Sequence, residues 1–377
     1  MDNLTHSLFG LTLARTPLGR AGRGTTVALL LASNAPDIDI VATAGGAVKY
    51  LEWHRGPTHG PLGVVALGLA SAGLAVLARR LWTARRRAAR DRADDASFVM
   101  LWIVSMIGVV CHVLMDLPTS YGTRPLSPFD WHWYAFDWMP IVDVYLLAVL
   151  AAGLWFGSRA APGARQRNAA IVLVLMALNY GLRGASHHQA LARAADAFGP
   201  VLPRRCPSAS PQGWIDRWPR SAAASSDADA RSGSGVPSCL GEVAAMPGFA
   251  SPFRWRLIAQ LSNGYELHDV DLLAMPAAAA RDQSPAPRLS IRYPNQWTPA
   301  VFRAAAAPVA QTFLGFSRFP AARSFVDNTG AATVRWSDMR FVASPLGDRR
   351  PVNSNLFSVL VRLDPAGGII EAKFGPR

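Results

Sequence analysis

Two histidines flank a break in the chain at residues 53–61, WHRGPTHGP. His54 and His59 are five positions apart, a rotation of about 500° on a helix, so one helical face cannot carry both. Pro57 disfavours helical geometry at Gly56 and suits the start of a new helix, so we expect His54 to close one segment and His59 to open the next. Both imidazoles then lie at a helix end, where a metal ion or an anion can bind.

Further histidines and carboxylates occur in the same half of the chain. Asp37 and Asp39 follow a proline in SNAPDID at residues 33–39, and His112 and Asp116 stand four positions apart in CHVLMD. On a helix this spacing places an imidazole and a carboxylate side by side, as two helical histidines are placed to bind zinc. Simpler interpretations remain open, with Asp37 as a helix cap and the His112–Asp116 pair as a hydrogen bond that stabilises the bundle.

The composition predicts that these polar residues belong to a membrane protein. The chain has 377 residues, of which 50% are hydrophobic and 17% charged, and this is too apolar for an ordinary soluble enzyme. A carboxylate inside a bilayer costs roughly 2.5–3.5 kcal/mol, so it calls for a partner such as a bound cation. We expect five or six spans, because three segments approach the roughly 20 residues that cross a bilayer and three are weaker candidates: 60–78, 98–117 and 139–157, then 4–18, 26–44 and 169–185.

Clustered arginines predict the orientation of the chain in the membrane. They gather at residues 15–23, 79–92 and 159–167, in loops that alternate along the predicted spans. By the positive-inside rule these loops are cytoplasmic, which is a better explanation than nucleic-acid binding because no aromatic residues are interleaved with them. The opposite, outer face then carries the region after residue 186 and all the ligand-type residues: His6, Asp37, Asp39, His54, His59, His112 and Asp116.

The C-terminal half predicts a second domain. Residues 187–252 are rich in Ser, Ala and Pro and indicate a flexible segment. From residue 253 to 377, apolar residues alternate in runs such as FRWRLIAQL and ATVRWSDMRFV, and 299–316 is Ala-rich, which predicts antiparallel strands with a helix. The predicted fold is therefore a mainly α membrane bundle over 1–186 with an exterior α+β domain. Cys206 and Cys239 fall outside the membrane, where they form either a disulfide or two free thiols.

Four segments together carry a family resemblance. MDNLTHSLFG, SNAPDID, HRGPTHG and HVLMDLPTSYGT, in this order over residues 1–145, resemble the YdjM-like family of bacterial inner-membrane proteins, which are described as metal-dependent hydrolases. The resemblance implies a multi-pass protein of the bacterial inner membrane. Combined with the orientation given by the arginines, this predicts that the C-terminal domain is periplasmic. It also implies a metal site built from His6, Asp37, Asp39, His54, His59, His112 and Asp116.

These residues predict a membrane-bound, metal-dependent hydrolase. Imidazole and carboxylate ligands suit Zn²⁺ first, with Mn²⁺ as the alternative. The metal would activate water, Asp39 would act as general base, and Arg55 would hold an anionic substrate. The predicted metal ligands are His6, Asp37, His54, His59, His112 and Asp116. At the outer face the substrate would be a lipid head group or another envelope phosphoester, and the partners would be membrane lipids but no nucleic acid.

Two non-enzymatic interpretations stay open. Ionisable groups inside spans often mark a metal or proton path, although here they lie on one side only. A scaffold is the second alternative, in which a His-Asp network only holds the helices together. Further candidate ligands, or partners of the ligands, are Asp130, His132, Asp137 and Asp143.

Overall fold

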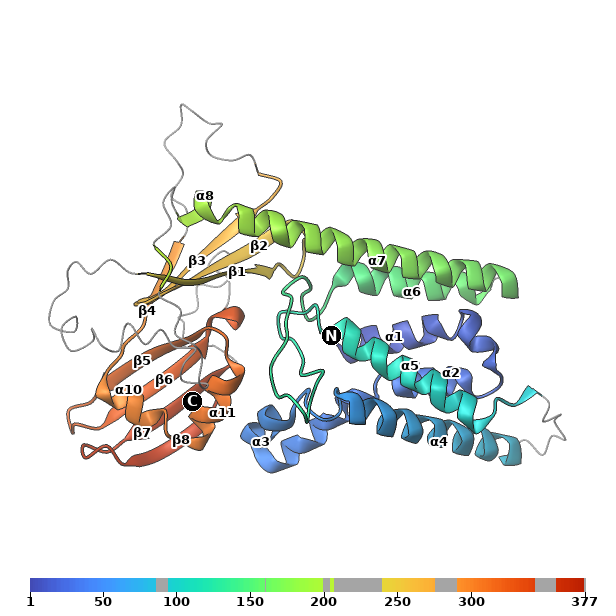
Figure 1. Cartoon of the computed structure of the whole chain (residues 1–377), viewed down its shortest axis with the longest axis horizontal. Coiled ribbons are helices and arrows are strands. Elements are labelled where there is room, and N and C mark those ends of the chain that lie inside the picture. The colour runs from blue at the N-terminus through green and yellow to red at the C-terminus, as the bar shows by residue number, and fades with distance from the viewer. Residues whose placement is uncertain are drawn as a thin grey trace. The chain divides into compact units, whose positions relative to one another are not determined.

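The chain forms two compact units, which are described separately. A computed structural model (Figure 1) describes residues 1–85, 94–159, 161–198, 204–206, 239–274, 290–342 and 357–375. The first unit comprises Met1–Ala44, Trp53–Ala185 and Pro247–Pro252, and the second comprises Gly45–Glu52, Ser186–Met246 and Phe253–Arg377.

The first unit is helical. Several of its helices begin at residues whose side chains accept a hydrogen bond from the first turn: Asp2 accepts from Thr5 N–H, and Ser97 and Asp143 cap later helices in the same way. The helices of the N-terminal half are α1 (Asn3–Leu13), η1 (Pro17–Ala21), α2 (Thr25–Ala32), η2 (Ala35–Gly45), α3 (Gly46–Trp53), α4 (Pro61–Arg85), α5 (Phe98–Asp116), α6 (Val144–Ser158) and α7 (Pro162–Ala192).

Fewer helices have the length and hydropathy needed to cross a membrane than the number of spans that the sequence predicted. Helices α4, α5 and α7 are long and apolar enough, and α2 with η2–α3 adds a fourth span if that pair, bent by 43°, counts as one. Helix α6 has 15 residues and extends about 22 Å, less than the roughly 30 Å of a hydrocarbon core. Helix α1 is shorter still, because the chain leaves it before Pro17. Five or six spans are therefore not confirmed among the described residues.

Small residues bring α2 close to two other helices. A Cβ atom added to Gly10 of α1 would lie 2.8 Å from Ser33 Oγ, and one added to Gly108 of α5 would lie 2.9 Å from Ala32 Cβ. Glycine at both positions lets the backbones approach, as is usual for helices packed in lipid. This packing places the segment after α2, which carries Asp37, next to the last two turns of α5, where His112 lies.

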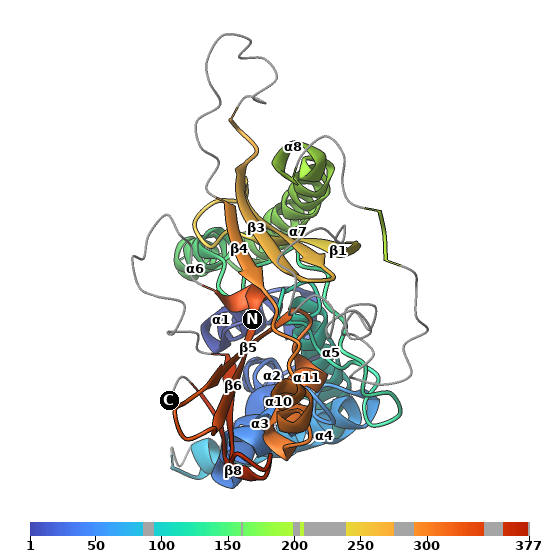
Figure 2. The same ribbon diagram turned by 90° about the vertical axis from the view of Figure 1, so that its left-hand side faces the viewer.

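The second unit contains two four-stranded sheets. The strand pairs β2–β3, β3–β4, β5–β6, β6–β7 and β7–β8 are antiparallel, which confirms the prediction of antiparallel strands. Figure 2 shows helices α10 (Pro299–Ala304) and α11 (Pro308–Phe316) beside the second sheet. The first sheet is β1 (Leu240–Pro247), β2 (Arg254–Leu261), β3 (Gly264–Asp271) and β4 (Ser290–Pro294), and the second is β5 (Pro320–Val326), β6 (Ala332–Asp338), β7 (Ser358–Leu363) and β8 (Ile369–Phe374).

Details of the second unit differ from the sequence-based expectation. The helix predicted over 299–316 is interrupted and restarts at Pro308, because proline lacks the N–H donor of a helix interior and suits a first turn. Strand β1 and the short helix α8 (Ala194–Phe198) lie within 187–252, which was predicted to be flexible, although 207–238 is outside the described residues. Cys206 and Cys239 form a disulfide, the first of the two alternatives.

Candidate metal centre

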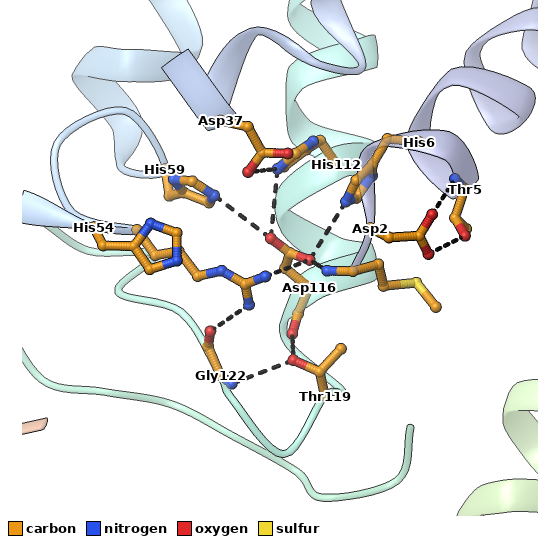
Figure 3. A network of polar contacts seen from close by, with 12 residues as sticks. Asp2, Thr5, His6, Asp37, His54, His59, His112, Asp116, Thr119 and Gly122 are labelled. Carbon is orange, nitrogen blue, oxygen red and sulfur yellow. Dashed lines mark hydrogen bonds and ion pairs between the residues drawn. The ribbon is translucent and has the colours of Figure 1, made fainter. Parts of the chain in front are cut away.

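Four ligand-type residues converge in the first unit. Asp37 from η2, His59 from the turn before α4, and His112 with Asp116 from α5 each offer one atom, and these atoms all lie within 4.8 Å of one another. Figure 3 shows the four side chains pointing toward a common centre, with the carboxylate of Asp116 in the middle. The sequence motifs around residues 33–39, 53–61 and 111–116 are thus brought together by the packing of α2, α4 and α5.

The distances within this group fit the coordination sphere of a small cation. Two of them start at His112 Nε2, which is 3.4 Å from Asp116 Oδ2 and 3.6 Å from Asp37 Oδ1. A third, from His59 Nε2 to Asp116 Oδ2, is 3.5 Å. Ligands about 2.1 Å from a tetrahedral ion are about 3.4 Å apart, because a tetrahedron's edge is about 1.6 times its centre-to-corner length. One divalent ion therefore matches these three spacings, and every pair among the four ligand atoms lies within 4.8 Å.

Several polar atoms in the group are buried and make no hydrogen bond within the described structure. They include Nε2 of both His59 and His112, and Oδ2 of both Asp37 and Asp116. A buried polar atom left without a partner costs about 1–3 kcal/mol, so native structures rarely keep several together. A cation that accepts their lone pairs removes this cost. The donor set, two imidazoles and two carboxylates, is one that Zn²⁺ and Mn²⁺ both accept.

The two histidines are oriented by their other ring nitrogen. His112 Nδ1 lies 2.8 Å from the carbonyl oxygen of Ser33, which can only accept, so Nδ1 carries the proton and Nε2 keeps its lone pair. His59 Nδ1 lies 3.0 Å from the hydroxyl of Thr58. Burial lowers the pKa of His59 well below its usual value, and the nearby His112 and Arg55 lower it further. The imidazole of His59 is therefore neutral near pH 7, the form that binds metal.

His6 lies against this group although it is not one of the four. Its Nε2 is 3.4 Å from Asp116 Oδ1, and its ring stacks on that of His112 with centroids 3.7 Å apart. Both ring nitrogens of His6 are buried and make no hydrogen bond within the described residues. The amino group of Met1 forms an ion pair with Asp116 on the same side. His6 Nε2 is therefore placed to serve as a further ligand, on the side of the group where Asp116 Oδ1 lies.

Asp39 and His54 form a separate pair beside the centre. Asp39 Oδ2 accepts the backbone N–H of Arg55 at 2.7 Å and lies 3.1 Å from His54 Nδ1. The same oxygen is 4.0 Å from His59 Nδ1, too far for a hydrogen bond. Asp39 thus supports the turn that carries Arg55, a non-glycine residue with φ of 51°. The structure does not bring His54 into the four-residue group.

Arg55 supplies a buried positive charge at the edge of the group. Its side chain is 5% exposed, and its Nη2 lies 3.3 Å from Asp116 Oδ1. Nη1 donates to the carbonyl oxygen of Gly122 at 2.7 Å, and the guanidinium lies over the ring of Tyr121. These contacts hold the guanidinium in one place, ready to face an anionic group.

The other candidates lie elsewhere. Asp143 pairs with Arg183 at 2.6 Å and caps α6, while the exposed Asp130 accepts from the backbone N–H of His132. Asp137 also lies outside the four-residue group. Sequence reasoning did not find the carbonyl of Ser33 or the amino group of Met1, because backbone groups leave no signature in residue types.

Apolar helices around a buried His-Asp group define a multi-pass membrane protein with a candidate metal site. The chain belongs to the YdjM inner membrane protein family, which matches residues 1–190 and so extends the resemblance predicted over 1–145. It is 26% identical over 184 residues to "Uncharacterized protein YfhP" of Bacillus subtilis (strain 168). That match covers 46% of this chain, and the chain spans about half (52%) of the length of this relative. No solved structure matches the chain significantly.

Proposed function

We propose that this membrane protein is a metal-dependent hydrolase whose divalent ion, Zn²⁺ or Mn²⁺, is held by Asp37, His59, His112 and Asp116, with His6 as an additional ligand. The observation that carries the proposal is the convergence of four ligand atoms within 4.8 Å, most of them buried and without hydrogen bonds in the described structure. A bound ion supplies Lewis acidity and activates water at neutral pH.

The chain's own residues provide the other functions of such a site. Arg55 orients an anionic substrate group, because its guanidinium is fixed by Gly122 and has little exposure to water. Asp39 and His54 act together in proton transfer, as a general base. Their 3.1 Å contact lets the carboxylate orient the imidazole, which is only 11% exposed at the edge of the group. Asp39 thereby keeps the role in proton transfer that the sequence predicted, acting together with His54.

Two observations support a substrate on the outer side of the inner membrane. The ligand residues lie at the end of α5 that is remote from Arg23 and Arg79, which meet Asp95 next to the start of that helix. By the positive-inside rule that arginine-rich end is cytoplasmic. The Cys206–Cys239 disulfide favours an oxidising, periplasmic location for the second unit. A lipid head group or another envelope phosphoester is the substrate class that fits Arg55 and this location.

Metal content and turnover together test the proposal. We would purify the full chain in detergent, measure bound metals by mass spectrometry, and then assay release of phosphate or head groups from phospholipids. His59→Ala and His112→Ala should lose both metal and turnover. His132→Ala is the matched control and should keep both, because His132 is an exposed residue outside the four-residue group.

The same experiment separates the alternatives. Metal without turnover, together with metal flux in proteoliposomes, would replace the hydrolase by a transporter. A well-folded native chain that binds no metal after reconstitution would leave a scaffold as the function.

A further inference from the structure

A cavity with several polar lining residues lies in the first unit, away from the metal centre. Its volume is about 500 Å³, and its lining includes Arg15, Arg20 and Arg165 together with Thr16 and Gln166. The cavity lies between the end of α1, η1, α6 and the start of α7. His6 belongs to the first turns of α1, whereas Arg15 follows that helix's last residue, so the two sites lie at opposite ends of α1.

The cavity is strongly positive. Three of its eleven lining residues are arginines, and no carboxylate is among the lining residues that the structure describes. Arg15 Nη1 donates to the carbonyl oxygen of Leu154 at 2.8 Å, and Arg20 Nη2 donates to Gln166 Oε1 at 2.5 Å, so both of these contacts are with neutral acceptors. Like charges gathered around one cavity repel one another, and the attraction of each arginine to an anion in the cavity would offset that repulsion.

Residues around the cavity leave space for the guanidinium group of Arg15. An added Cβ atom on Gly157 would lie 2.7 Å from Arg15 Nη1, so glycine leaves the space that this guanidinium occupies. On the same end of α6, Trp155 is 64% exposed and Phe156 is 73% exposed. Exposed aromatic residues at a helix end are typical of the membrane–water interface. The cavity therefore opens at the depth where phospholipid head groups lie.

We propose that this cavity, distinct from the metal centre, binds a phosphate group, supplied either by an anionic phospholipid of the adjacent leaflet or by a soluble phosphate compound. Basic pockets between membrane helices are known to favour such head groups. The plainer explanation is that these arginines only set the orientation of the helices, which needs their charge but no cavity. If the arginines only set the orientation of the helices in the membrane, arginines outside the cavity should matter as much as those that line it. If the cavity binds phosphate, only the arginines that line it should matter.

The test measures lipid binding to the full chain in detergent, with native mass spectrometry as the readout. The probes are phosphatidylglycerol, phosphatidylcholine and inorganic phosphate, each titrated separately. We expect phosphatidylglycerol to bind, with an association constant that falls about fivefold in Arg20→Gln and about twenty-five-fold in Arg15→Gln/Arg165→Gln. Arg167→Gln, an exposed arginine of the same helix end that does not line the cavity, is the matched control and should bind as the native chain does.

Each outcome decides the proposal. Weaker phosphatidylglycerol binding in the cavity variants alone supports a lipid site, and equally reduced binding of inorganic phosphate, without lipid preference, supports the same cavity with a soluble ligand. If Arg167→Gln weakens binding as much as Arg20→Gln, or if neither cavity variant changes it, the proposal is overturned. Arg20 is exposed, so Arg20→Gln keeps the test valid even if the double variant unfolds. Unchanged metal content in these variants would separate this site from the proposed hydrolase.

Discussion

Replacing Asp116 by Asn tests the centre at the residue on which its contacts converge. The substitution keeps the shape of the side chain but removes the charge that faces His6, His59 and His112 at 3.4–3.5 Å. Losing an outer partner of a metal ligand typically lowers metal affinity 10–100-fold, and losing a ligand itself should exceed that range. We therefore expect Asp116→Asn to lower the affinity more than a hundredfold, equivalent to more than about 2.7 kcal/mol.

The fold should also lose stability. Asp116 faces the guanidinium of Arg55 and the amino group of Met1, and its own side chain is fully buried. Removing one partner of a buried ion pair costs about 3–5 kcal/mol, because the remaining charge stays buried without compensation. Asp143→Asn is a matched control, since Asp143 is also fully buried and pairs with Arg183 outside the metal centre. Both variants should therefore unfold at lower temperature, but only Asp116→Asn should lose metal.

Competition with a fluorescent chelator, on detergent-purified protein below its unfolding temperature, measures the metal affinity. Asp39→Asn belongs in the same series, because Asp39 contacts His54 and the Arg55 backbone but lies 4.0 Å from His59. We expect it to lower the affinity only 10–100-fold, as for other residues that position a ligand. The reasoning is refuted if Asp143→Asn loses as much metal as Asp116→Asn, or if Asp116→Asn retains native affinity.

Three further predictions follow from other contacts. Gly108→Val should push α5 away from Ala32, lower the free energy of unfolding by about 1–3 kcal/mol and weaken metal binding, as thermal unfolding and chelator competition would show. Arg55→Lys keeps the charge but loses the bond to Gly122 O, so we expect native metal content with turnover about a hundredfold lower. Tyr265→Phe should lower the free energy of unfolding by about 1 kcal/mol at pH 7, because it removes the hydrogen bond that the hydroxyl donates to Pro320 O.

The tyrosine also predicts a pH dependence. Burial raises the pKa of Tyr265 above its usual value, so the folded state keeps the phenol proton when the unfolded state releases it. The stabilisation is complete below a pH of about 10 and is lost as the pH rises further. Denaturant unfolding at pH 8 and pH 11 should therefore show a larger loss of unfolding free energy at pH 11 in the native chain than in Tyr265→Phe; equal losses would contradict this.

The other two variants have refuting outcomes of their own. For Gly108→Val, unchanged metal affinity would contradict the packing argument. For Arg55→Lys, native turnover would contradict the proposed role of the guanidinium.

Composition predicted the class of fold better than its details. Long apolar runs identified α4 and α5, because nearly every residue that faces lipid must be apolar, whereas α7 contains 169–185, which was only one of the weaker candidates. The number of spans was not predictable, since the apolar run 139–157 yields only the 15-residue helix α6, which begins at Val144 because Asp143 caps it there. In the second unit, β2 and β6 carry aromatic and branched residues in alternation and were found. Strands β1 (LGEVAAMP) and β5 (PAARSFV) are rich in Ala and were missed, because packing against a sheet rather than their own pattern selects the extended state.

Within the candidate centre, local spacing predicted some contacts and left others undecided. His112 and Asp116 face the same side of one helix wherever that helix lies, so their pairing follows from the i, i+4 spacing. Asp37 and Asp39 are different: η2 is a 3₁₀ helix, in which two steps turn the chain by about 240°, so residues two apart point in directions about 120° apart. Only one of them can therefore face the centre, and the choice depends on how η2 packs beside α5. The sequence shows that a proline precedes both carboxylates, but it does not contain the direction in which that turn is rotated.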